Sequence, residues 1–155
     1  MRFLLYSFFV MIIFFITKAS ENNPANSGKY GDITVIIENL DCDNGVLLSQ
    51  LFYLKFNDKT DFPIKSDKAY RSISAKINNK MTTFVFENVP YGTYALCAHH
   101  DINNNHKMDK TFLGFPAEPY GLSNNPTIYF TVPTFDDCKF EVNKKNTEIR
   151  LIMKK

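Results

Sequence analysis

The chain has 155 residues, with 18 Lys and Arg against 16 Asp and Glu, so its formal net charge is +2 at pH 7. This length suits one domain with a real hydrophobic core. So small a positive excess excludes an electrostatic nucleic-acid interface, which needs clustered basic residues.

Residues 1–20 are predicted to be a secretory signal peptide. Arg2 precedes an apolar run over 3–17, and Ala19 offers a small residue near the cleavage site. An uncleaved anchor is the alternative, but the run is shorter than the roughly 20 residues of a spanning helix. Cleavage would remove Arg2 and Lys18 and no acid, which takes the net charge from +2 to zero. We therefore expect a secreted or periplasmic protein, with no nucleic-acid partner and no membrane contact after signal removal.

Residues 21–31 form a polar leader without a periodic apolar face, and we expect this leader to be flexible. The domain itself is predicted to span residues 32–155. Its first strand, 32–40, ends just before Asn44-Gly45, a dipeptide typical of two-residue hairpin turns. A second strand at 46–54 is therefore expected to pair antiparallel with the first.

Further short apolar segments follow a charged loop that contains Pro63. Alternation with a period of two is clearest at Phe84 and Phe86, and again at Tyr94 and Leu96. Further strands are predicted at 69–77, 81–89, 90–100, 127–132, 138–142 and 147–153. Seven or eight short strands without a helical stripe predict an all-β fold. We expect a single antiparallel β-sandwich, immunoglobulin-like or transthyretin-like, with one long ordered polar loop.

Three cysteines follow the signal segment: Cys42, Cys97 and Cys138. Export permits disulfides, and the odd number leaves at least one thiol unpaired or pairing between chains. If one bridge forms, the polar turns beside Cys42 and Cys138 favour that pair. Cys97 lies in an apolar strand and is predicted to be a small buried residue.

Polar side chains at alternating positions of the run 99–125 have the spacing of a calcium loop. Such loops take oxygen ligands from positions 1, 3, 5, 7 and 9, the seventh through its carbonyl. A carboxylate farther along can return to the ion. The predicted ligands are Asp101, Asn103, Asn105, Lys107, Asp109 and Glu118. With so few carboxylates, we expect a dissociation constant on the order of 10⁻⁴ to 10⁻³ M.

The same run allows three other interpretations. A solvated turn, in which side chains cap backbone amides, needs no ion. The carboxylates of Asp101, Asp109 and Glu118 could serve an extracytoplasmic hydrolase that uses paired acids. A zinc or copper site could use imidazole and thiol ligands, which are available in His99, His100, His106 and Cys97.

Two observations rank the hydrolase and the zinc or copper site below calcium, whereas the solvated turn stays open beside it. Adjacent residues of a regular strand point to opposite faces, so His99 and His100 cannot both reach one metal from it. The chain also lacks a Gly-x-Ser-x-Gly elbow, a His-Glu-x-x-His pair and a phosphate-binding glycine loop. We therefore expect a non-enzymatic protein.

Three longer motifs are "FENVPYGTYALCAHHDINNNHKMD", "FLGFPAEPYGLSNN" and "PTFDDCKFEV". They resemble the family of exported bacterial proteins known as domain of unknown function 2141, over about Asp32 to Met153. The resemblance implies no established activity, and its "GTY" turn is also similar to that of transthyretin-like and carboxypeptidase-regulatory-like β-sandwiches. The family usually has glycine at Asn104 and His106 and alanine at Cys138. The matching positions are His100, Asp101, Asn103, Asn105, Asp109, Leu113, Gly114, Pro116, Glu118, Tyr120, Gly121, Ser123, Asn124 and Asn125.

An ordered loop of this length in a compact domain is usually functional or held by something. We expect the polar run to be an ion-stapled connection between strands, with 118–125 as its outgoing arm. Its rim is then the predicted surface for a partner, a protein or a glycan.

Overall fold

The computed structural model describes residues 29–128 and 131–155. The predicted signal peptide, 1–20, and residues 21–28 of the predicted leader lie outside these ranges. Strand β1 begins at Tyr30. No helix in the described ranges is both long and apolar enough to cross a membrane.

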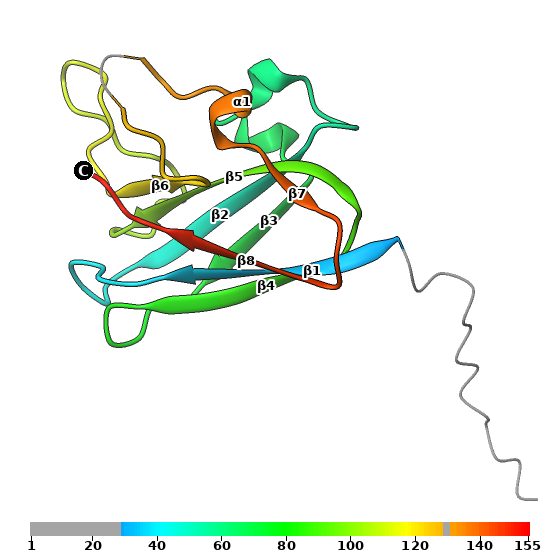
Figure 1. The fold of residues 1–155 in the computed structure, drawn as a ribbon. Helices are drawn as coiled ribbons and strands as arrows, with labels where there is room; N and C mark the ends of the chain where they lie inside the picture. Colours follow the sequence, from blue (N-terminus) through cyan, green and yellow to red (C-terminus); the bar gives the residue numbers. More distant parts are fainter. Residues whose placement is uncertain (1–28, 129–130) are drawn as a thin grey trace, which may run out of the picture.

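Two stacked sheets form a β-sandwich, which confirms the predicted fold class (Figure 1). The first sheet has the order β4 (Thr82–Pro90), β1 (Tyr30–Ile37), β8 (Asn146–Leu151). The second has the order β3 (Arg71–Ala75), β2 (Val46–Tyr53), β5 (Gly92–Asp101), β6 (Tyr120–Leu122), with β7 (Phe140–Val142) paired to β5. Helical structure in the described ranges is limited to single turns: η2 (Lys59–Asp61), η3 (Ser66–Lys68) and α1 (Phe135–Cys138).

The main core lies between the two sheets and follows the predicted alternation. Ile33 and Val35 of β1 are fully buried, and Phe86 of β4 packs beside them. From the second sheet, Tyr94 and Leu96 of β5 enter the same cluster. Burial of each such side chain contributes about 1.5–3 kcal/mol, so this alternation is what selects the sandwich.

The opposite face of β5 is also covered. Ala95 and Cys97 pack against Phe62 of the β2–β3 connection and against Phe135 and Cys138 of α1. Because β5 is buried on both faces, it reads as a nearly continuous apolar run rather than as an alternating one.

The hairpin predicted between residues 32–40 and 46–54 is wrong. β1 pairs antiparallel with β4 and parallel with β8, whereas β2 pairs with β3 and β5. The connection 38–45 therefore crosses from one sheet to the other, and Leu40 is buried in the main core on the way. Both strands carry an apolar face, and these faces bury each other across the sandwich rather than side by side in one sheet. The parallel β1–β8 pair also means that the sandwich is not purely antiparallel.

Two further strand predictions need correction. In the predicted strand 127–132, residues 127–128 and 131–132 are irregular, and residues 129–130 lie outside the described ranges. The chain instead forms β6 at Tyr120–Leu122, inside the predicted outgoing arm. The first residue of the predicted strand 138–142 belongs to α1, where Thr134 and Asp137 form a capping box.

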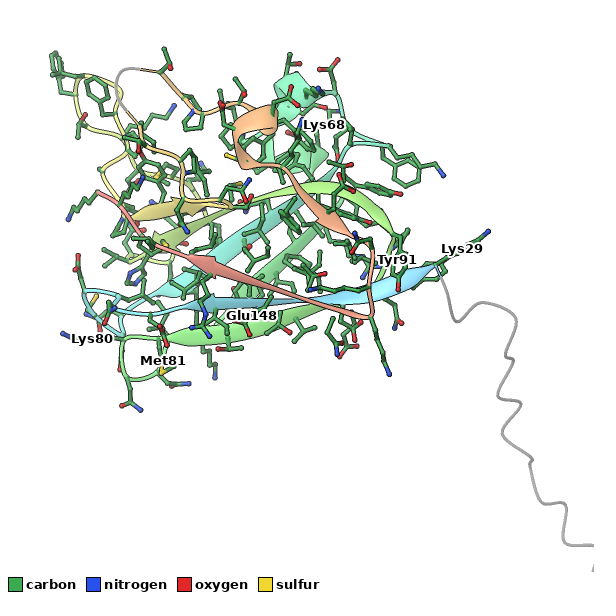
Figure 2. All side chains as sticks on the ribbon, viewed as in Figure 1. Lys29, Lys68, Lys80, Met81, Tyr91 and Glu148 are labelled. Carbon is green, nitrogen blue, oxygen red and sulfur yellow. The ribbon has the colours of Figure 1, made fainter. Side chains whose placement is uncertain are left out.

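Several connections meet at one end of the sandwich. The β3–β4 turn with Lys80 and Met81 lies there, opposite the end that holds Lys29 and Tyr91 (Figure 2). Asp43 of the 38–45 connection accepts hydrogen bonds from Lys80 N at 2.6 Å and from Asn79 N at 3.0 Å. The C-terminus and the loop that follows β5 lie toward this end as well (Figure 1).

Candidate functional site

Residues 102–119 connect β5 to β6, two strands that pair antiparallel. The loop narrows to a finger, because Ala117 N donates to Asp109 O at 2.7 Å and Lys110 forms an isolated bridge with Pro116. A turn closes the finger, where Thr111 N donates to Phe115 O at 2.8 Å. The polar run is therefore an ordered hairpin-like loop with a defined base and tip.

The Asp101 carboxylate holds the first half of the loop. Asp101 is fully buried, and its two oxygens accept hydrogen bonds from Asn105 N at 3.1 Å and His106 N at 2.8 Å. To bring these amides back to one carboxylate, Asn104 and His106 adopt φ values of 59° and 60°. These are the positions at which the resemblance implied glycine, and Asn and His are among the residues that tolerate such φ values best.

Asn103, Asn105 and Asp109 continue the same network. Asn103 Oδ1 accepts from Asn105 N at 3.1 Å, and Asn105 Oδ1 accepts from Lys107 N at 2.8 Å. The two amide groups then donate to Asp109, from Asn103 Nδ2 at 2.7 Å and from Asn105 Nδ2 at 2.9 Å. Each short side chain thus bends the backbone locally and links to the next.

Glu118 closes the base of the loop from the returning side. It is buried, and its oxygens accept from Ile102 N at 2.9 Å and Asp109 N at 3.3 Å. Because the Glu118 carboxylate bonds both the start of the loop at Ile102 and its middle at Asp109, the loop cannot open at its base without breaking its bonds to these two amides.

The 38–45 connection supports the loop from below. The His100 ring donates from Nε2 to Asn44 O at 2.6 Å, and His100 N donates to Pro119 O at 2.8 Å. Gly45 has φ 80°, and a Cβ built on it would lie 2.0 Å from Asp101 O. Only a glycine fits between the turn and the β5 backbone there, so two connections are packed into one rigid base.

The tip of the loop is apolar and exposed, which the sequence analysis missed by treating the run as polar. The relative exposures of Phe112, Leu113 and Phe115 are 103%, 77% and 64%. Gly114 lies between them with φ 84° and nothing within 4 Å of an added Cβ. The sequence signal was present in "FLGF", three apolar residues around a turn glycine, bounded by Thr111 and Pro116.

The structure brings together four of the six predicted calcium ligands. Asp101, Asn103, Asn105 and Asp109 share one hydrogen-bond network, whereas Glu118 bonds to the backbone at the base of the loop. The Lys107 side chain is exposed.

The fit to a cation is incomplete. Within the described ranges, no three residues among His, Cys, Asp and Glu are gathered in a way that could hold a metal. A hard cation would need the amide oxygens of Asn103 and Asn105. In the structure the amide nitrogens of these two residues, and not the oxygens, point toward Asp109.

The alternative readings find less support in this geometry. His100 lies on the face of β5 toward the 38–45 connection, and His99 lies on the other, so the two are not neighbours around one site. Burial lowers the pKa of His99, and the nearby carboxylates of Glu118 and Asp101 offset this only in part. Both oxygens of Asp101 and of Glu118 are already bonded to backbone amides, which leaves them poorly placed for acid–base work.

All three cysteines are free thiols, so the bridge favoured between Cys42 and Cys138 is not formed. Cys42 lies in the 38–45 connection, whereas Cys138 is the last residue of α1 and belongs with Cys97 to the second core cluster. Burial raises the pKa of the Cys97 and Cys138 thiols to about 12. Thiols of this kind are inert packing residues rather than nucleophiles.

Comparison with models of known protein families gives a match over most of the described chain. A family model described as an uncharacterized protein conserved in bacteria (DUF2141) matches residues 35–150. Neither the curated proteins nor the solved structures contain a match to the chain. The matched range includes the whole of the loop 102–119 and the strands on either side of it.

Proposed function

Since this chain belongs to the DUF2141 family of uncharacterized bacterial proteins, we propose that it is an exported, non-enzymatic β-sandwich whose binding element is the loop 102–119. One observation carries this proposal. The base of the loop is locked by two buried carboxylates, Asp101 and Glu118, while its tip exposes three apolar side chains.

The contrast between base and tip favours binding over a purely structural role. A loop that only connected β5 to β6 would gain nothing from apolar residues held in water at its far end. A surface that binds a partner is instead expected to combine exposed apolar groups with a fixed shape, because preorganisation reduces the entropy lost on binding.

Calcium is the second part of the proposal. The Asx turns at Asn103 and Asn105, together with the bonds from Asn105 N and His106 N to Asp101, give the loop the bend that alternating ligand positions need. Calcium binding would turn the two asparagine amides over, so that their oxygens exchange the bonds from Asn105 N and Lys107 N for the ion beside Asp109. Only two carboxylates would then ligate, Asp101 and Asp109, which supports weak binding at extracellular calcium levels rather than a permanent ion.

The test compares binding of three purified forms, each without residues 1–20, to fractions of the bacterial envelope. The forms are the parent, a tip variant (Phe112→Ser, Leu113→Ser and Phe115→Ser together) and a control variant (Phe56→Ser and Ile64→Ser together). Phe56 and Ile64 are 64% and 72% exposed in the β2–β3 connection, so the control removes comparable exposed groups from another surface.

Membranes, cell-wall sacculi and secreted proteins are assayed separately by cosedimentation or pull-down. The proposal expects the parent and the control to bind at least one fraction and the tip variant to lose that binding. It is refuted if the parent binds no fraction, or if the tip variant binds every fraction as the parent does.

A further inference from the structure

We propose that the tip of the loop 102–119 inserts into an anionic lipid surface. This inference rests on the proposed function, because it names the partner of the same loop. The sequence alone predicts no membrane contact for the mature chain, and the exposure of Phe112, Leu113 and Phe115 is the observation that changes this expectation.

The size of the apolar tip fits a bilayer better than a protein. A phenylalanine side chain buries roughly 150–250 Å², so the three tip residues, at their exposures, offer roughly 400 Å². A standard protein interface takes about 800 Å² from each partner, so a protein would also have to contact surface outside the apolar tip. The tip is instead the narrow end of a finger, and a bilayer can close around it on all sides.

The charges beside the tip fit anionic headgroups. Residues 102–117 contain two lysines, Lys107 and Lys110, and both are exposed. The single acid in that segment is Asp109, whose oxygens accept from Asn103 Nδ2 and Asn105 Nδ2. With Glu118 included, the loop 102–119 is formally neutral, but Glu118 is buried at the base and Lys110 lies two residues from Phe112. The two exposed lysines are therefore the charges that can extend to headgroup level beside the tip.

The turn is also formed before any contact. Gly114 N donates to Thr111 O at 2.8 Å, and Phe115 N donates to Thr111 Oγ1 at 3.2 Å. These bonds satisfy backbone groups that would otherwise enter the hydrocarbon unpaired, a cost that excludes most loops from membranes. The finger can insert its tip side chains shallowly without refolding.

The first experiment measures cosedimentation with lipid vesicles in buffer that contains a chelator, so that calcium cannot bridge protein and lipid. One set is phosphatidylcholine alone, and the other is an equimolar mixture with phosphatidylglycerol. The parent is expected to bind the mixed vesicles more tightly. Its binding should weaken in about 1 M salt, where the Debye length is about 3 Å.

Substitution at the tip gives the matched comparison. Replacing Phe115 by Ser should lower the partition coefficient about tenfold, since burial of a phenylalanine corresponds to at least one factor of ten in affinity. Phe56→Ser removes a phenylalanine of the same 64% exposure from another surface and should leave the partition coefficient unchanged.

The second experiment uses fluorescence, since the chain contains no tryptophan. Phe112→Trp places the only indole at the tip, and its emission is expected to shift to the blue when mixed vesicles are added. Phe56→Trp is the control and should show no shift.

The inference is overturned if the parent does not bind mixed vesicles, if Phe115→Ser binds as well as the parent, or if the Phe112→Trp emission does not move. Tip-dependent binding to sacculi or secreted proteins without vesicle binding would overturn the inference and leave the proposed function standing. If the parent shows no binding that depends on the tip, to vesicles or to any envelope fraction, both the inference and the proposed function are overturned.

Discussion

Replacing Asp101 by Ala tests whether a buried side chain, rather than the strands alone, holds the loop 102–119. The substitution removes the two carboxylate oxygens that accept hydrogen bonds from Asn105 N and His106 N. Asn105 N keeps Asn103 Oδ1 at 3.1 Å, so His106 N is the amide left without its acceptor. Since a hydrogen bond to a charged group contributes about 1.5–3 kcal/mol, we expect the free energy of unfolding to fall by about 2–3 kcal/mol. The melting temperature should fall by roughly 10 °C in a domain of this size.

Urea denaturation of the parent, Asp101→Ala and Asp41→Ala measures this effect. Asp41 is an exposed acid at the same end of the molecule, with no side-chain hydrogen bond to any described residue, so its loss should change stability little. Amide hydrogen exchange adds a local readout, because His106 N–H should lose protection in Asp101→Ala and keep it in Asp41→Ala.

The same variants test calcium. At about 10 mM calcium, a site with a dissociation constant of about 10⁻⁴ to 10⁻³ M would stabilise the parent by roughly 1.4–2.7 kcal/mol. Asp101→Ala should show no such gain.

Two results would refute the reasoning. If Asp101→Ala unfolds at the same urea concentration as the parent and keeps its His106 protection, the carboxylate does not hold the loop. If calcium leaves the parent unchanged, or stabilises Asp101→Ala equally, the ion does not bind where the spacing predicts.

Three further predictions concern the framework around the loop. Gly45→Ala should cost more than about 2 kcal/mol in the free energy of unfolding and Gly114→Ala only about 1, since both have positive φ but only Gly45 faces backbone at 2.0 Å. Ser123→Ala should cost about 1–3 kcal/mol by urea denaturation, because its buried hydroxyl bonds both the β5 and α1 backbones. Stability should also fall as the pH rises from about 9 to about 12. Burial raises the pKa of the Cys97 and Cys138 thiols from 9.0 to about 12, so between these values the unfolded chain loses the thiol protons that the folded chain still holds. The urea midpoint against pH measures this, and Cys97→Ala combined with Cys138→Ala should flatten the curve.

Each of these predictions has a contrary outcome. Equal losses for Gly45→Ala and Gly114→Ala would mean that backbone strain, and not the contact with Asp101, decides the cost. A neutral Ser123→Ala would mean that water replaces the hydroxyl. An unchanged pH slope in the double cysteine variant would assign alkaline unfolding to other groups.

Period-two alternation was sufficient to predict the sandwich. Phe84 with Phe86, and Tyr94 with Leu96, face the core as predicted, because the side-chain period of a strand is local and independent of pairing. Strand partners were not predictable in the same way. The Asn44-Gly45 turn suggested a hairpin, but burial of two apolar faces against each other sends the chain across to the other sheet.

The loop shows the same division. Alternating Asp and Asn residues predicted a bent polar connection, because their short side chains bond to nearby backbone amides wherever they occur, and the bonds to Asn105 N and His106 N follow that rule. What the sequence could not determine was burial, which depends on residues distant along the chain. Gly45 packs against Asp101 from the 38–45 connection, and Glu118 at the far end of the loop bonds back to Ile102 N, so that the base is rigid. With the base filled in this way, Phe112, Leu113 and Phe115 are left in solvent, and only the tertiary structure could decide that outcome.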